Sequence, residues 1–116
     1  MKFGITNENP YKGKVVILVN EQTQSSLEFS AMALSRIPGA VTIGSTTAGA
    51  DGNVSYIDLP GGIKTMISGI GIFYPDGGQT QRTGVRIDEI AEPTVEAIKT
   101  GKDEVLERAI EIINKK

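Results

Sequence analysis

The sequence of 116 residues predicts an α/β fold built from strand–helix–strand units. The first observation is a continuous β-branched run at 15–19, which is typical of a parallel strand buried on both faces. A helix start signal follows it, and a second short strand is expected at 41–43. Strand, helix and strand with such short connections predict a right-handed βαβ unit. The length fits a single domain over residues 1–116, or one part of a larger domain.

The first helix is expected at 27–36. Ser25 and Glu28 stand three residues apart just before its apolar run, which is a capping-box pattern. Pro38 and Gly39 end the helix. Its segment 29–34 is apolar almost all round, so we expect it to be sandwiched between other elements.

The middle of the chain reads as loops and one hairpin. Residues 44–53 form a loop of small and polar residues, and strands are expected at 54–59 and 63–74 with a turn at 60–62. These two strands predict an antiparallel hairpin. A further turn is expected at 75–78, followed by extended chain at 84–90.

Two helices are expected at the C-terminal end. Pro93 can open a short helix that runs to Lys99 and breaks at 100–101. Asp103 can cap a last helix through Asn114, and the apolar stripe of this helix predicts that it packs against the rest of the protein. The stripe consists of Val105, Leu106, Ala109, Ile110 and Ile113.

Composition excludes several classes of function. Twelve basic and fourteen acidic side chains give a net charge of −2, with no basic stripe of the kind that nucleic-acid modules carry. Without Cys or His, the chain cannot form disulfides, thiol catalysts, Cys zinc sites or a complete Ser-His-Asp triad. We therefore expect no metal and no cofactor. No apolar run approaches the roughly 18 residues of a membrane-spanning helix, so no membrane insertion is expected.

Ser25 and Ser26 are the candidate catalytic residues. They lie where the loop after a buried strand meets a helix N-terminus, which offers N–H groups without intrahelical acceptors and a partial positive charge. A serine there can be a nucleophile whose oxyanion those N–H groups receive. A serine three residues before a Glu is also a common helix cap, and no base is evident nearby. The residues alone leave both roles open.

Five motifs follow one another along the chain: GKVVILVNE at 13–21, the Thr23, Ser25 and Glu28 pattern, GSTTAG at 44–49, YPDG at 74–77 and GVRID at 84–88. In this order and spacing they resemble the C-terminal processing (tail-specific) serine peptidases and their tricorn-core relatives. The similarity spans most of residues 13–114.

This resemblance implies a ClpP-like or crotonase-like spiral of βαβ units with a β-hairpin and a C-terminal helix. It implies a serine endopeptidase that cleaves protein or peptide chains through an acyl-enzyme. The nucleophile of the family stands three residues before a Glu, which is Ser25 here, and the oxyanion is partly received by the following N–H, that of Ser26.

The sequence departs from the family where the general base is expected. The family lysine falls on Ala50 or, with a shift of one residue, on Asp51. Ser55 replaces a family glutamine, and Ile87 replaces the proline before the aspartate. Three interpretations remain. The base is a histidine from an earlier segment, the protein is a non-catalytic peptide- or ligand-binding pseudo-peptidase, or Lys64 substitutes.

The resemblance also predicts what surrounds this sequence. The family carries a preceding part of the catalytic domain, often with a PDZ domain, so we expect a C-terminal fragment of a larger bacterial protein of the cell envelope, periplasm or secreted space. The fragment alone should be inactive. A domain divided through its sheet exposes edges and apolar surface, which predicts self-association through the strand at 41–43 or the helix at 27–36.

Overall fold

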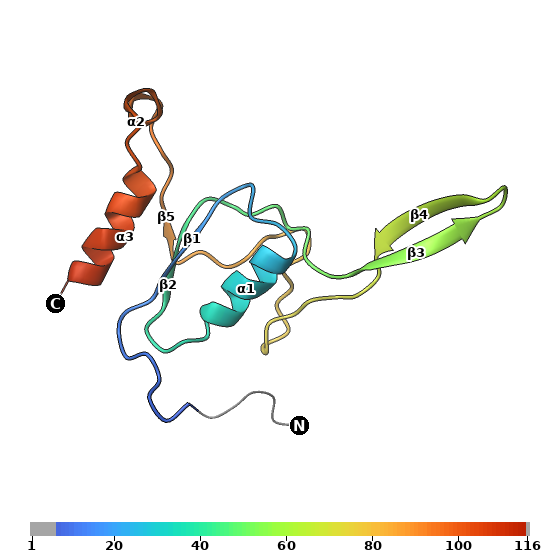
Figure 1. Ribbon diagram of the computed structural model, residues 1–116, viewed down its shortest axis with the longest axis horizontal. Helices are drawn as coiled ribbons and strands as arrows, with labels where there is room; N and C mark the ends of the chain where they lie inside the picture. Colours follow the sequence, from blue (N-terminus) through green and yellow to red (C-terminus); the bar gives the residue numbers. More distant parts are fainter. Residues whose placement is uncertain (1–6, 116) are drawn as a thin grey trace.

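The computed structural model describes residues 7–115, which form a mixed α/β fold (Figure 1). Among these residues, no helix has the length and apolar character needed to span a membrane. The elements in chain order are β1 (Val16–Val19), α1 (Ser26–Leu34), β2 (Val41–Gly44), β3 (Val54–Leu59), β4 (Ile63–Ser68), β5 (Glu89–Ile90), α2 (Val95–Thr100) and α3 (Glu104–Asn114).

A three-stranded parallel sheet in the order β1-β2-β5 organises the chain. Val16 of β1 pairs with Val41 of β2, and Ile43 of β2 pairs with Glu89 of β5. Helix α1 connects the first two parallel strands, so the predicted βαβ unit is confirmed.

Strand β2 is the central strand, so the predicted interface at an exposed edge formed by 41–43 is wrong. The chain beyond residue 84 returns to cover that edge. The Asp88 N–H donates to the Thr42 carbonyl at 2.8 Å, and the Asp88 carboxylate accepts the Thr42 N–H at 2.8 Å. The two open edges of the described sheet are therefore those of β1 and β5.

The apolar core between the sheet and α1 is small. It contains Ile17, Val19, Ala31 and Val85, with Val15, Ala40 and Ile87 packed against it. The sequence predicts that β1 is buried on both faces, but Leu18 is 41% exposed, so this prediction is wrong for one face. Helix α1 is not sandwiched either: Leu27, Phe29 and Leu34 are exposed, because β1 covers one side of the helix and no described element covers the other.

The predicted antiparallel hairpin is confirmed as β3 and β4, and it extends away from the sheet (Figure 1). Strand β4 ends at Ser68 rather than at residue 74. Beyond that point the backbone bonds elsewhere: the Thr80 N–H donates to the Ile72 carbonyl at 3.3 Å, and the Gln81 amide donates to the Ile70 carbonyl at 2.9 Å. The segment at 70–72 thus leaves the hairpin ladder to pair with 80–81.

The last helix begins at its expected cap, Asp103, whereas α2 begins at Val95, two residues after the expected Pro93, with Thr94 as its N-cap. Thr94 Oγ1 accepts the Ala97 N–H at 3.1 Å, and Asp103 Oδ1 accepts the Leu106 N–H at 2.9 Å. Helix α3 contacts β1 and β2, and Arg108 binds both carboxylate oxygens of Glu89 on β5. In its apolar stripe, Ala109 is buried and Val105 half-buried, whereas Leu106, Ile110 and Ile113 are exposed. The predicted packing therefore holds for only part of the stripe.

A buried carboxylate, that of Glu28, ties α1 to the loop after β2, and no ion pair among residues 7–115 includes it. Glu28 has an exposed fraction of 0%. Its Oε1 accepts the Thr47 hydroxyl at 2.5 Å and the Gly49 N–H at 2.7 Å. Its Oε2 accepts the N–H groups of Ala50 at 2.9 Å and Ser25 at 3.2 Å. Four donors thus satisfy a charge that would otherwise be costly to bury.

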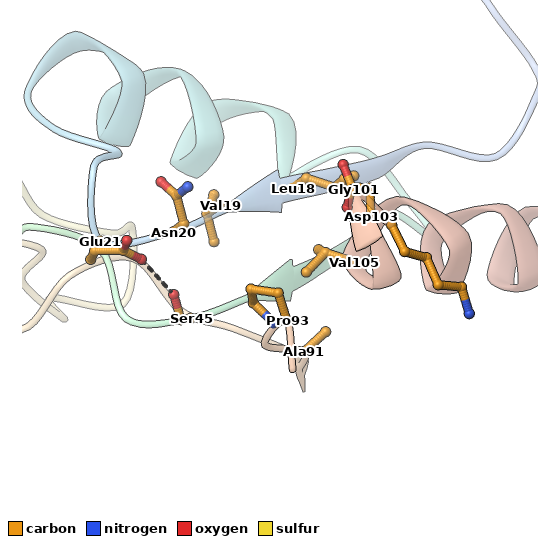
Figure 2. A pocket seen from close by; sticks show the side chains of 11 residues that line it. Leu18, Val19, Asn20, Glu21, Ser45, Ala91, Pro93, Gly101, Asp103 and Val105 are labelled. Carbon is orange, nitrogen blue, oxygen red and sulfur yellow. Dashed lines mark hydrogen bonds between the residues drawn. The ribbon is translucent and has the colours of Figure 1, made fainter. Parts of the chain in front are cut away.

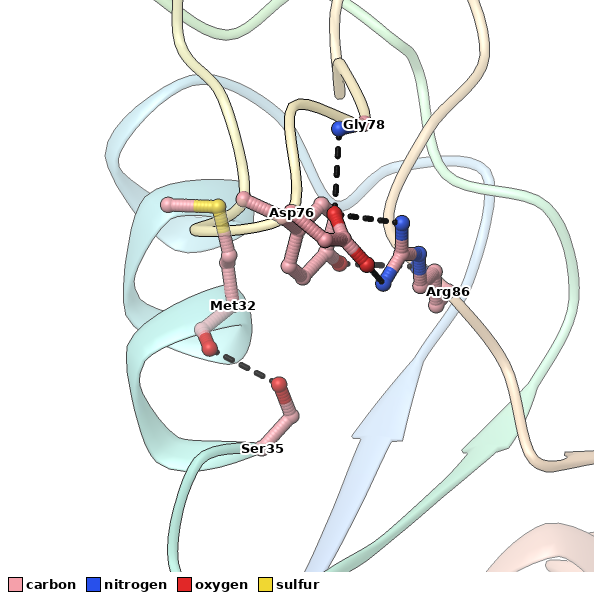
Figure 3. Close-up of polar contacts among 6 residues, drawn as sticks. Met32, Ser35, Asp76, Gly78 and Arg86 are labelled. Carbon is pink, nitrogen blue, oxygen red and sulfur yellow. Dashed lines mark hydrogen bonds and ion pairs between the residues drawn. The ribbon is translucent and has the colours of Figure 1, made fainter.

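An exposed ion pair fixes the turn at 75–78 (Figure 3). The Arg86 guanidinium donates to both carboxylate oxygens of Asp76, at 2.7 and 2.9 Å, and lies 4.2 Å from the centre of the Tyr74 ring. The Gly78 N–H also donates to Asp76. The Arg86 hydrogen bonds, with that of Gly78, lower the pKa of Asp76 to about 2.

Replacing Arg86 by Gln should raise the pKa of Asp76 toward the ordinary aspartate value of about 3.9. A carboxyl pKa that folding lowers contributes stability above the unfolded-state value, and this is lost as pH falls through about 2. An NMR titration of the Asp76 carboxyl carbon measures the change. An unchanged midpoint in the variant would contradict the assignment of the shift to Arg86.

Replacing Glu28 by Gln should lower the free energy of unfolding by about 3 kcal/mol. The NH2 group of Gln would face N–H or O–H donors that now bind a carboxylate oxygen, and the remaining hydrogen bonds would lose their charged acceptor. Urea unfolding measures this. Glu96→Gln, on the exposed surface of α2, is the matched control and should stay within about 0.5 kcal/mol of the parent. Equal effects of the two substitutions would contradict a central role for Glu28.

Candidate active site

Ser25 lies on a sharp turn between β1 and α1, in a backbone conformation that residues other than glycine rarely adopt. Its φ is 54° and its ψ is −119°. Such a conformation costs about 1–3 kcal/mol and persists only where the surroundings enforce it. A strained serine on a strand-to-helix turn is the arrangement that presents a nucleophile in the nucleophile elbow. The geometry therefore favours a chemical role for Ser25 beside its role as N-cap.

Of the predicted capping box, the Glu28 half forms, since the Glu28 carboxylate accepts the Ser25 N–H at 3.2 Å, and the Ser25 side chain makes no cap hydrogen bond. The residue after it, Ser26, is the first residue of α1, so its N–H has no acceptor within the helix. Ser25 and Ser26 are both exposed. The turn thus places an accessible hydroxyl directly before a helix N-terminus that can stabilise negative charge.

The loop at 44–53 reaches this turn and is held from both sides. Besides donating to Glu28, Thr47 Oγ1 accepts the Val85 N–H at 3.0 Å. The Arg82 N–H donates to the Gly49 carbonyl at 2.6 Å. Gly49 has φ of 65°, and a Cβ there would lie 3.0 Å from the Arg82 carbonyl carbon. Only glycine allows this close approach without strain.

A cavity of about 300 Å³ opens beside the two serines. Its lining combines the start of α1, the loop after β2 and the segment at 70–72. The lining residues are Ser25, Ser26, Phe29, Asp51, Gly52, Asn53, Ile70 and Ile72. The loop after β2 and the candidate nucleophile therefore face one shared space.

The two positions of the family lysine have different surroundings. Ala50 has its N–H bound to Glu28 and offers only a methyl group. Asp51 is 3% exposed, and its carboxylate accepts the Thr80 hydroxyl at 3.3 Å and the Gly52 N–H at 2.7 Å. Lys64 lies on β4 and pairs with Asp58 at 3.0 Å, outside the residues that line the cavity. This geometry gives no support to Lys64 as a substitute base.

Sequence reasoning missed three polar residues that shape the site: the buried Thr47 and Thr80, and the half-buried Gln81. The Gln81 amide donates to the backbone carbonyl of Asp51 at 2.8 Å, and Thr80 has an exposed fraction of 0%. Threonine and glutamine in a loop carry no periodic signal. Their roles become visible only in the structure, where the segments 47–51 and 80–85 contact each other.

A second, larger cavity of about 530 Å³ lies at the carboxyl ends of β1 and β2, between the sheet and the α2–α3 connection (Figure 2). Glu21 and Ser45 meet across its floor, where the serine hydroxyl donates to the carboxylate at 3.3 Å. Leu18, Pro93 and Val105 supply its apolar wall. None of the candidate catalytic residues lines this cavity.

Comparison of structures finds the same fold in known proteins. A protein from Parabacteroides merdae, named as a candidate peptidase, matches 95% of this chain with a TM-score of 0.81 and 23% identity. Mature CPAF complexed with lactacystin matches 94% with a TM-score of 0.74 and 24% identity. Another structure of mature CPAF matches 87% with a TM-score of 0.70 and 25% identity.

The chain spans 35% of the length of the Parabacteroides protein and 21–22% of CPAF. No curated protein matches it significantly. The pattern that describes peptidase family S41 matches residues 2–91, which is most of the sequence. The chain therefore belongs to peptidase family S41, the C-terminal processing peptidases, as its motifs indicated.

Proposed function

We propose that this chain is the nucleophile-bearing part of a serine endopeptidase and that Ser25 forms the acyl-enzyme. The observation that carries the proposal is the strained backbone of Ser25, held at the start of α1 and beside a cavity. A serine that served only as a cap would not need a left-handed φ, because caps ordinarily have extended backbone.

In the proposed reaction, Ser25 Oγ attacks the carbonyl carbon of a peptide bond and its proton passes to a base. The oxyanion accepts the Ser26 N–H, which requires no rearrangement because it already lies at the helix N-terminus. The leaving amine takes the proton, and water then hydrolyses the ester. The substrate is a protein or peptide chain.

The base comes from outside this sequence in our proposal, because the chain has no His and neither Ala50 nor Asp51 can replace the family lysine. We expect these 116 residues alone to be inactive. The second candidate function is a non-catalytic peptide- or ligand-binding module on the same fold. The missing lysine favours it, and it requires no attacking hydroxyl.

The wider setting follows the family resemblance. We propose that the chain is the C-terminal part of a larger catalytic domain, that residues 1–116 act as one domain, and that the complete domain forms a ClpP-like or crotonase-like spiral. The exposed apolar side chains of α1 are consistent with a further covering layer. We propose a tail-specific, tricorn-like peptidase in the envelope, periplasm or exterior of a bacterium.

In the complete peptidase, Ser25→Ala and Ser25→Asn should each abolish activity and labelling by a fluorophosphonate, because neither side chain can replace the attacking hydroxyl. Ser26→Ala should keep most of the activity, since alanine retains the backbone N–H. Casein hydrolysis and intact-mass spectrometry measure the two effects. Thermal unfolding checks that each variant is folded.

Other outcomes discriminate between the candidate functions. Activity in Ser25→Asn together with its loss in Ser26→Ala would move the nucleophile to Ser26. A complete protein that neither labels nor cleaves, yet binds peptides, would support the binding module. Full activity in both variants would exclude this site.

The isolated chain should self-associate, because exposed apolar surface is costly in water. Two surfaces contribute: the uncovered side of α1 and the hairpin face formed by Ile57, Leu59, Ile63 and Ile67. Light scattering should show dimers or larger species, and Leu34→Lys on α1 should reduce them. Ile98→Lys, an exposed apolar position on α2, is the control. A monomer at high concentration would contradict the prediction.

A further inference from the structure

Glu28 Oε2 binds the candidate nucleophile and the loop after β2 with one oxygen atom. It accepts the Ser25 N–H at 3.2 Å and the Ala50 N–H at 2.9 Å. The two nitrogen atoms are therefore no more than about 6 Å apart. Asp51 follows Ala50 directly and lines the same cavity as Ser25. Asp51, which is 3% exposed, thus follows a residue whose backbone is bound beside the serine turn, and it lines the cavity there.

The Asp51 carboxylate can accept hydrogen bonds from further donors. It accepts one hydroxyl, that of Thr80, and one N–H, that of Gly52, whereas an ionised carboxylate offers about four acceptor positions. None of the ion pairs among the described residues includes Asp51. The other carboxylate bound to this loop, Glu28, has all four of its bonds within the protein.

The backbone around Asp51 is fixed on both sides. The Gln81 side-chain amide donates to the Asp51 carbonyl and, with its second bond, to the Ile70 carbonyl. The Ala50 N–H before it is bound to Glu28. In a catalytic triad the base is oriented by a third group that accepts a hydrogen bond from its other N–H, and this role requires a fixed acceptor.

We propose that Asp51 is a positioning residue: the cavity beside Ser25 receives a nitrogen base from outside this chain, and the Asp51 carboxylate accepts the N–H of that base. This rests on the proposed function of Ser25. The cavity of about 300 Å³ has room for an imidazole ring. Thus Asp51 holds the base, and the base takes the proton of Ser25 Oγ.

Free imidazole tests the proposal in the 116-residue chain. A fluorophosphonate reacts by forming the bond between Ser25 Oγ and phosphorus, releasing fluoride, while the serine proton passes to imidazole. Intact-mass spectrometry follows the rate of phosphonylation over imidazole concentration and pH. We expect labelling to be negligible without imidazole and to rise, with saturation, when it is added.

Asp51→Asn should reduce the imidazole-dependent rate by at least about tenfold. It should also lower the midpoint of the pH profile, because a carboxylate next to imidazolium raises its pKa and the amide does not. A purely structural role would not move this midpoint. Asp58→Asn, the same chemical change on the exposed hairpin, is the control, and circular dichroism verifies that each variant keeps its fold.

The outcomes separate this proposal from the proposed function. Equal imidazole-dependent rates and midpoints in the parent and Asp51→Asn would overturn the role of Asp51 and leave Ser25 as the nucleophile. Labelling that is absent at every imidazole concentration, with the parent chain folded, would overturn both. A lowered rate with an unmoved midpoint would also overturn the positioning role, because it would indicate only a disturbed site.

Discussion

The burial of one carboxylate, that of Glu28, determines the geometry of the whole candidate site. A charge with no exposed surface and no cation beside it is stable only when donors surround it. Here the donors come from two segments that the sheet places at the same end, the turn before α1 and the loop after β2. Satisfying the charge therefore requires both segments to adopt one definite conformation.

The hydrogen bond to Glu28 also stabilises the strained backbone conformation of Ser25. A non-glycine residue with φ of 54° would relax if its surroundings allowed it. The bond from its N–H to Glu28 and the bond from its carbonyl to the Phe29 N–H hold the residue from both sides. The backbone of Ser25 carries the structural role. Its hydroxyl is consequently available for chemistry, which reconciles the cap and the nucleophile.

Much of the fold could be predicted from local patterns. The last helix begins and ends where Asp103 and Asn114 predicted, and β3 occupies the expected residues 54–59, because helix caps and turn residues are local signals. The edge of the sheet could not be predicted, since β5 has two residues and no recognisable pattern. The end of β4 at Ser68 could not be predicted either, because it depends on hydrogen bonds between 70–72 and 80–81.

The candidate site could also be predicted only in part, because its remaining contacts join residues that are far apart in the sequence. Ser25 and Glu28 are close in sequence, so their relation could be read from their spacing of three residues. Asp51 is 26 positions from Ser25, and only the shared Glu28 oxygen and the cavity bring the two together. A motif comparison registers only that no lysine stands at Ala50 or Asp51. In the structure Asp51 is a buried carboxylate with acceptor capacity, beside a site whose base this sequence does not supply. In the role proposed for Asp51, the site therefore does not carry its own base but holds one that enters it.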